Sequence, residues 1–223
     1  MRPAHPRLPS GSATRRALGG FTALWLGCAA GCQLLGWRIN TSGSIPVGLY
    51  RVSRAPLSSI AQGAYVMFCP PPTPLFAMAR ARGYLGAGFC PGGHGYLMKR
   101  VAAAPKDCVR FGADGVRVNG QLLAFSAPLR TDAAGRALPR YQAWARVLPS
   151  TEVLLMSEAS RTGFDARYFG PLPVRQIDHV IVPLMTWPTA ARRDAHRGGP
   201  RGVGACHGLA DCNGESRHNP LKE

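Results

Sequence analysis

The sequence predicts a mainly β protein, an antiparallel β-barrel or sheet body that follows one apolar N-terminal helix. From residue 45 onward, short apolar and β-branched runs are separated by turns that contain Gly and Pro. Residues 17–37 contain 21 positions without a single charge. The chain has 223 residues and is 46% hydrophobic, which is enough to bury one good core and excludes wholesale disorder.

The N-terminal region divides into two parts. Residues 1–16 are rich in Pro, Ser and Arg, and we expect a disordered cytoplasmic segment. Residues 17–37 are long enough to cross a hydrocarbon core of about 30 Å as a transmembrane helix. The four arginines before this run favour a cytoplasmic N-terminus and a translocated body. A cleaved signal peptide is the alternative, but the length of the run favours a retained anchor.

Residues 38–188 are predicted to form the β body. Asn119-Gly120 lies at the centre of an alternating stretch and is a strong hairpin signal. One helix is expected over 75–85, and residues 124–148 are expected to be a loop or small subdomain. The tail, residues 189–223, has no periodicity and is predicted to be disordered. The other strands are predicted over residues 47–53, 64–69, 96–102, 107–111, 152–157 and 179–183.

The charge balance is strongly basic, with 27 Lys and Arg against 11 Asp and Glu and a formal net charge of +16. Such a surplus suits an anionic membrane surface or a nucleic acid. The chain has no dense basic run with interleaved aromatic residues, and no zinc-finger or helix-turn-helix signature. We therefore expect no specific nucleic-acid partner.

Ser44 and Lys99 are the candidate catalytic residues. A serine hydroxyl is a poor nucleophile near neutral pH and needs a neighbouring base. Lys99 lies in a strand-like run whose apolar face would lower the pKa of its amine. It is one of only three lysines, and arginine cannot be deprotonated in a protein. Taken singly, Ser44 could be a turn residue and Lys99 a solvated edge charge.

Three segments together resemble a known family. SGSIPVGLY (42–50), GYLMKRVAAAPKD (95–107) and FDARYFGP (164–171) are similar, in this order, to the signature boxes of type I signal peptidases. Within that family they resemble the conjugative-transfer branch, the TraF-type pilin-processing peptidases. The resemblance covers roughly residues 15 to 188 and implies a signal-peptidase-like fold for the β body.

The resemblance also implies roles for single residues. Ser44 would be the nucleophile and Lys99 the general base. The oxyanion would be held by the Ser44 backbone N–H, together with the hydroxyl of Ser42. Asp165 and Arg167 would border the active site.

Asp165 and Arg167 stand two positions apart, so on a strand they would share a face and pair. The alternative is an ordinary surface ion pair. Upstream of this box the chain departs from the common family pattern, so the hydroxyl that would hydrogen-bond Lys99 is not fixed. Thr162 and Ser160 are the candidates for it.

The cysteines suggest one further feature. Cys69 and Cys90 bracket a Pro-rich insertion and could form a disulfide if the body faces an oxidising periplasm, or they could stay reduced. Cys206 and Cys212 lie near histidines of the tail, but their spacing matches no strong metal template. We expect no metal and no cofactor.

These observations favour a membrane-anchored serine endopeptidase with a Ser-Lys dyad that cleaves N-terminal signal peptides from exported proteins. By resemblance, it would accept small residues such as Ala one and three positions before the cut. The expected partners are an exported preprotein, above all the pilin precursor of a conjugation or type IV secretion system, and inner-membrane lipid. The expected location is the bacterial inner membrane, with a single pass and the catalytic domain in the periplasm.

Several alternatives remain at this point. Within the enzyme class, the alternative is a general housekeeping signal peptidase. Outside it, a non-catalytic envelope component of the secretion machinery would use the same scaffold. A self-cleaving repressor with the same Ser-Lys fold would need an N-terminal DNA-binding domain, where this chain has an apolar span. Joining of the new pilin ends into a ring also stays open.

Overall fold

The computed structural model describes residues 11–57, 60–141, 145–157 and 160–187. The chain divides into two compact units, Met1–Arg38 and Ile39–Glu223. The predictions for residues 1–10 and for the tail from residue 189 fall outside the described residues.

The helix of the first unit is α1 (Gly11–Leu34). It begins at Gly11, so residues 11–16 are helical rather than disordered, and it ends at Leu34 rather than Trp37. None of the described helices combines the length and the mean hydropathy that crossing a membrane requires. The predicted transmembrane helix is therefore not confirmed.

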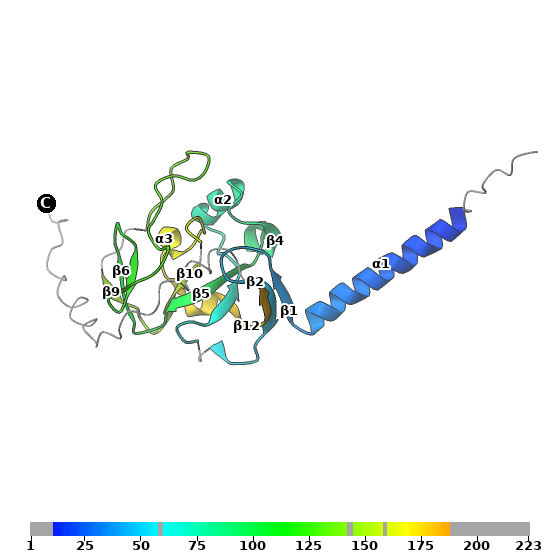
Figure 1. The fold of residues 1–223 in the computed structure, drawn as a ribbon, viewed down its shortest axis with the longest axis horizontal. Helices are drawn as coiled ribbons and strands as arrows, with labels where there is room; N and C mark the ends of the chain where they lie inside the picture. Colours follow the sequence, from blue (N-terminus) through cyan, green and yellow to red (C-terminus); the bar gives the residue numbers. More distant parts are fainter. Residues whose placement is uncertain (1–10, 58–59, 142–144, 158–159, 188–223) are drawn as a thin grey trace, which may run out of the picture. The chain divides into compact units, whose positions relative to one another are not determined.

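The second unit is mainly β, as predicted, and its short helices lie between strands (Figure 1). The strands are β1 (Trp37–Asn40), β2 (Val47–Val52), β3 (Tyr65–Phe68), β4 (Ala87–Cys90), β5 (Leu97–Ala103), β6 (Cys108–Phe111), β7 (Val116–Val118), β8 (Gln121–Leu122), β9 (Arg146–Val147), β10 (Glu152–Met156), β11 (Leu172–Pro173) and β12 (Ile177–Trp187). The helices are α2 (Pro74–Ala81) and α3 (Ala166–Phe169), with 3-10 turns at Pro91–Gly93 and Val174–Gln176.

The strands form two antiparallel sheets. The larger has seven strands in the order β1-β2-β12-β3-β5-β10-β11, and the smaller has four in the order β8-β7-β6-β9. Within the described chain the larger sheet is open, because β1 and β11 end its two sides and do not pair with each other. The sheet alternative of the prediction is therefore the right one, and the closed barrel is not found.

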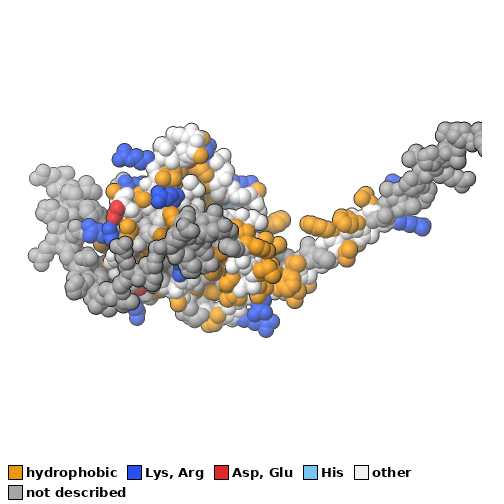
Figure 2. All heavy atoms as spheres, in the orientation of Figure 1, with side chains coloured by type: hydrophobic (Ala, Val, Ile, Leu, Met, Phe, Trp, Pro, Cys, Tyr) orange, Lys and Arg blue, Asp and Glu red, His pale blue; other side chains and the backbone are white. Residues whose placement is uncertain are grey.

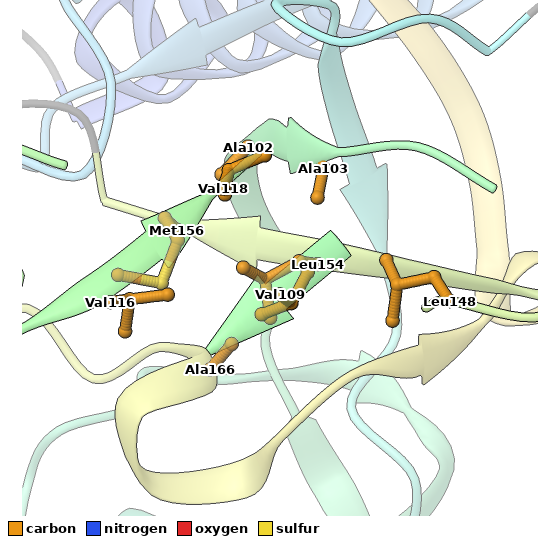
Figure 3. Close-up of a cluster of buried hydrophobic side chains, with 9 residues drawn as sticks. All are labelled: Ala102, Ala103, Val109, Val116, Val118, Leu148, Leu154, Met156 and Ala166. Carbon is orange, nitrogen blue, oxygen red and sulfur yellow. The ribbon is translucent and has the colours of Figure 1, made fainter. Parts of the chain in front are cut away.

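The two sheets are joined by a cluster of small and medium apolar side chains (Figure 3). Val109, Val116 and Val118 of the smaller sheet belong to the same buried cluster as Leu154 and Met156 of β10. Apolar burial of this kind stabilises a fold by about 25 cal/mol per Å² removed from water. A second cluster contains Val66, Phe68, Val101, Val153, Leu155 and Ile177. Strands β5 and β10 contribute to both clusters, so the strand that carries Lys99 is packed into the core on both sides.

Most predicted strands are present with ends shifted by a residue or two, and two elements differ more. Helix α2 stops at Ala81 instead of residue 85, because Gly83 adopts a positive φ of 78° just beyond it. Strand β12 continues past its predicted end at Pro183 to Trp187. Its pairing with β2 shifts register between Pro183 and Met185, since proline has no N–H to donate to the ladder.

Cys69 and Cys90 form a disulfide, which closes the segment that contains α2 and β4. After the disulfide the chain passes through the 3-10 turn and His94, and β5 begins at Leu97. On the face drawn in Figure 2, Lys and Arg side chains are spread over the body rather than gathered in one dense patch.

Candidate active site

The loop that carries Ser44 connects β1 to β2 and is anchored at its far end. Ile45 is buried at 2% exposure in a cluster with Tyr50, Met67 and Ile181. The Tyr50 hydroxyl donates to the Pro46 carbonyl oxygen at 2.6 Å. Ser44 itself is half-buried. The residue after the nucleophile is thus fixed in the core, which holds the Ser44 side chain at the surface of the sheet.

Asn40, the last residue of β1, braces this loop from the other end. Its side-chain amide donates to the carbonyl oxygens of Ser42, Ile45 and Pro46 at 2.9, 2.9 and 3.1 Å. Its Oδ1 accepts from the Ser42 backbone N–H at 3.2 Å and from the Ser42 hydroxyl at 2.8 Å. One buried carboxamide thereby replaces the regular hydrogen bonds that a strand or helix would provide.

Lys99 extends from β5 to meet the Ser44 loop. Its side chain is 1% exposed, and its Nζ lies 2.8 Å from Ser44 Oγ and 2.9 Å from Ser157 Oγ. The structure thus brings together the two residues that the sequence selected, which stand 55 positions apart. The solvated-charge alternative does not fit the burial of Lys99, whereas Ser44 does lie in a turn, where its hydroxyl contacts the amine.

Burial lowers the pKa of the Lys99 amine from 10.5 to about 8, because the charged form loses its hydration. The nearby Asp165 carboxylate acts in the opposite direction and raises the pKa, while Arg167 lowers it further. A neutral amine can accept a proton from a serine hydroxyl, so a pKa near neutrality is what a general base requires.

Ser157 is the functional residue that sequence reasoning missed. It follows β10 directly, and Met156 pairs with Arg100 of β5, so the next position along β10 lies beside Lys99. Gly163 permits this placement, because a Cβ there would lie 2.2 Å from Ser157 Oγ. Ser160 and Thr162, the residues expected to bond Lys99, instead lie 3.4 Å from each other through their hydroxyls.

The only signal for Ser157 in the sequence was its place at the end of a predicted strand. Choosing it over Ser160 required the register between β5 and β10, which the sequence does not contain.

Asp165 and Arg167 are both buried, at 0% and 1% exposure, and pair through Nε–Oδ1 at 2.7 Å and Nη2–Oδ2 at 2.9 Å. The surface-pair alternative is therefore wrong. The expected strand geometry is also wrong, because Asp165 caps the N-terminus of α3, accepting from the Arg167 backbone N–H. A cap bond and an ion pair share one carboxylate.

This ion pair frames the segment that holds Ser157. Asp165 Oδ2 accepts from the Ser157 backbone N–H at 3.0 Å. The Arg167 guanidinium also donates to five carbonyl oxygens. These belong to Phe125, Ala127, Ser160, Arg161 and Gly163. The pair therefore acts on Lys99 in two ways, through its charges and through the backbone around Ser157.

Ser44 and Lys99 open into a hollow of about 490 Å³, which we call the cleft. Lys99 is the only charged residue among the described residues that line it. The lining residues are Ile39, Asn40, Thr41, Ser42, Gly43, Ser44, Gly83, Tyr84, Gly86, Tyr96, Leu97, Met98, Lys99, Ser160, Thr162, Gly163 and Phe164. A cleft with a single charged residue suits an uncharged peptide segment better than a strongly charged ligand.

Known proteins with similar sequences were found over most of the chain. The family model described as signal peptidase, peptidase S26, matches residues 21–185. Plasmid transfer protein TraF of Escherichia coli is 56% identical over 170 residues, which cover 76% of this chain and 93% of that protein.

The similarity extends to more distant proteins. Conjugal transfer protein TraF of Agrobacterium tumefaciens (strain 15955) is 36% identical over 152 residues, covering 68% of this chain and 84% of that protein. A crystal structure of a signal peptidase I from Enterococcus faecalis V583 aligns with a TM-score of 0.31 and 15% identity, over 55% of this chain and 96% of that chain.

Proposed function

The chain belongs to the signal peptidase family, peptidase S26, and within it to the branch of the TraF conjugal transfer proteins, and from this we propose that it is a serine endopeptidase with a Ser44–Lys99 dyad. The observation that carries the proposal is the 2.8 Å contact between Ser44 Oγ and the Nζ of a lysine that is 1% exposed. The buried amine supplies the base that the serine lacks.

The reaction follows from this geometry. The neutral Lys99 amine takes the Ser44 proton as Ser44 Oγ attacks the carbonyl carbon of the scissile peptide bond. The C–N bond then breaks, Lys99 returns its proton to the leaving amine, and the acyl group stays on Ser44 as an ester. Water then attacks the ester carbonyl carbon while Lys99 takes its proton. The ester C–O bond breaks, Lys99 gives the proton to Ser44 Oγ, and the new carboxylic acid leaves. Ser157 orients the amine through its hydroxyl.

The oxyanion is assigned to the Ser44 backbone N–H, which has no hydrogen-bond partner among the described residues. The Ser42 hydroxyl is the second donor in this proposal. At rest it donates to Asn40 Oδ1 at 2.8 Å, so it must turn from Asn40 toward the substrate as negative charge develops.

The proposed substrate is an exported preprotein, specifically the pilin precursor of a conjugation apparatus, and the relatives named for plasmid and conjugal transfer support this choice. We place the protein in the inner membrane with a single pass and its catalytic unit in the periplasm. Exposed apolar side chains along α1 (Leu18, Phe21, Leu24, Trp25, Leu26) and the Cys69–Cys90 disulfide are consistent with this location. Tethering would keep the cleft close to signal segments held in the bilayer.

The experiment is cleavage of two substrates by the full-length protein, a pilin precursor from the same conjugation gene cluster and a general secretory preprotein. Lys99→Arg and Ser44→Ala should each lower kcat by about 10²- to 10⁴-fold or more, since an arginine cannot act as base. Lys106→Arg, at an exposed lysine, is the matched control and should cleave normally.

Normal processing by Lys99→Arg would overturn the dyad. No cleavage of either substrate by the wild type would favour a non-catalytic envelope role. Cleavage of the secretory preprotein but not of the pilin precursor would favour a housekeeping peptidase.

A further inference from the structure

One side of the cleft is built from the segment that the Cys69–Cys90 disulfide closes. After α2 ends, Gly83, Tyr84 and Gly86 line the same hollow as Ser44. Tyr84 is the only one of these three with a side chain that can define the width of the cleft. Its backbone N–H donates to the Ala79 carbonyl oxygen at 2.8 Å, which ties its position to α2.

The Tyr84 ring is packed against a block of aromatic side chains. Its centroid lies 5.7 Å from that of Phe164, which also lines the cleft. Phe164 is stacked on Tyr168 with centroids 5.5 Å apart and meets Phe76 of α2 edge-on at 6.1 Å. Because this block is buried, the ring cannot move toward Phe164 without disturbing a core cluster.

The outer end of Tyr84 is fixed by residues 130–138, which we call the arm. The Tyr84 hydroxyl donates to Asp132 Oδ2, and Arg136 Nε donates to the same oxygen at 2.7 Å. Asp132 Oδ1 accepts the backbone N–H groups of Ala134 and Arg136, each at 2.9 Å. The hydrogen bond from Tyr84, together with those from Arg136 and Ala134, holds the pKa of Asp132 well below its usual range.

The arm has a second attachment next to Tyr84. Arg82 Nη1 donates to the Ala137 carbonyl oxygen at 2.7 Å, and the arm closes on itself through Leu138 N–H to Arg130 O at 2.9 Å. The Arg136 guanidinium also lies 5.9 Å from the centre of the Tyr84 ring. Tyr84 is therefore held at its backbone, at its ring and at its hydroxyl.

We propose that Tyr84 is a specificity-determining residue, a rigid wall that limits the size of the substrate side chains that enter the cleft beside Ser44. The inference rests on the proposed peptidase function. A wall that could swing aside would admit large side chains, whereas one fixed on three sides favours small ones. The arm is its brace, because Asp132 contacts Tyr84 and does not line the cleft.

The test is a ratio of two kcat/KM values measured with the full-length protein. The probes are peptides that span the cleavage region of the pilin precursor, with Ala at each of the four positions before the cut or with Leu replacing Ala at one of them. Tyr84→Ala should reduce the preference for Ala over Leu at one position by about tenfold or more. Tyr84→Phe and Asp132→Asn keep the ring but free it, so their ratios should fall between those of Tyr84→Ala and the wild type.

Asp114→Asn is the matched control, since it removes a carboxylate paired with Arg117 on the smaller sheet, and its ratio should equal that of the wild type. Equal losses on the Ala and Leu peptides in all three variants would overturn the inference, because a purely structural role lowers every rate alike. If the wild type cleaved no peptide, the proposed function itself would fall. If Tyr84→Ala did not fold, an unchanged Ala-over-Leu ratio in Tyr84→Phe and Asp132→Asn would overturn the proposal that Tyr84 limits the size of the substrate side chain.

Discussion

A buried amine held between two hydroxyls is the decisive feature at the scale of single residues. Lys99 Nζ has three hydrogen-bonding directions when charged, and Ser44 and Ser157 occupy two of them at 2.8 and 2.9 Å. When the amine is neutral, Ser157 keeps one direction fixed, so the lone pair can face Ser44. In the proposed mechanism, Ser157 does not react, but it sets the position of the Lys99 amine that accepts the proton.

This account predicts that Ser157→Ala lowers kcat by about tenfold, the value of one lost hydrogen bond to the amine, with little change in KM. Steady-state cleavage kinetics measure it. Thr162→Ala removes a hydroxyl that lines the same cleft without contacting Lys99, and should retain the wild-type kcat. Equal loss in the two variants would mean that Ser157 does not orient the base.

Ser44 and Lys99 could be predicted from the sequence because their chemistry and their flanking residues are local. Pro46 stiffens the loop, and the scarcity of lysine makes Lys99 stand out. Ser157 and Asn40 could not be chosen in this way. Ser157 lies beside Lys99, which is distant along the chain, and the Asn40 side chain folds back on the loop that carries Ser44. Residue types alone do not specify such contacts.

At the scale of elements, α3 and the residue before it hold the segments that surround the site. Arg167 links Asp165 to five carbonyl oxygens, so segments 125–127 and 160–163 are held by one guanidinium. Without this guanidinium, the carbonyl oxygens would be buried away from water with no hydrogen-bond donor, which costs free energy. Helix α3 itself is short and ends at Gly170, which adopts a positive φ of 76°.

Arg167→Lys is expected to lower the free energy of unfolding by about 3–5 kcal/mol, because an ammonium cannot reproduce the planar set of donors and leaves buried oxygens unpaired. Denaturant unfolding measures the change. The control is Arg117→Lys at the exposed pair with Asp114, which should change stability by about 1 kcal/mol or less. A loss at Arg167 no larger than at Arg117 would contradict the supporting role.

The elements that the sequence predicted are mainly short apolar or β-branched runs bounded by turn residues. Strands β5 and β10 were expected within a residue of their ends, because each is a short apolar run that local sequence signals. The two-residue strands β9 and β11, and the turn α3, were missed, since each exists only through pairing or capping by residues elsewhere. The extension of β12 past Pro183 depends on its partner β2, which local signals do not include.

At the scale of the whole molecule, the predicted family and the mainly β class are confirmed, whereas the closed-barrel alternative and the membrane span are not. The barrel is an open seven-stranded sheet among the described residues, since closure depends on how edge strands meet. The expected membrane span is not confirmed. The sequence prediction used length and the absence of charge, whereas the structural criterion also requires a minimum mean hydropathy.

The most direct measurement of the central claim is the titration of Lys99 by NMR in full-length protein labelled with ¹³C only in lysine. The chain has three lysines, so the Lys99→Met variant identifies the Lys99 resonance by its loss. Because the lowered pKa leaves the amine neutral once the pH rises above it, we expect this resonance to titrate at about 8, with the cleavage rate rising over the same pH range. Titration near the ordinary value of 10.5, with a cleavage rate that does not change around pH 8, would contradict the assignment of Lys99 as the base.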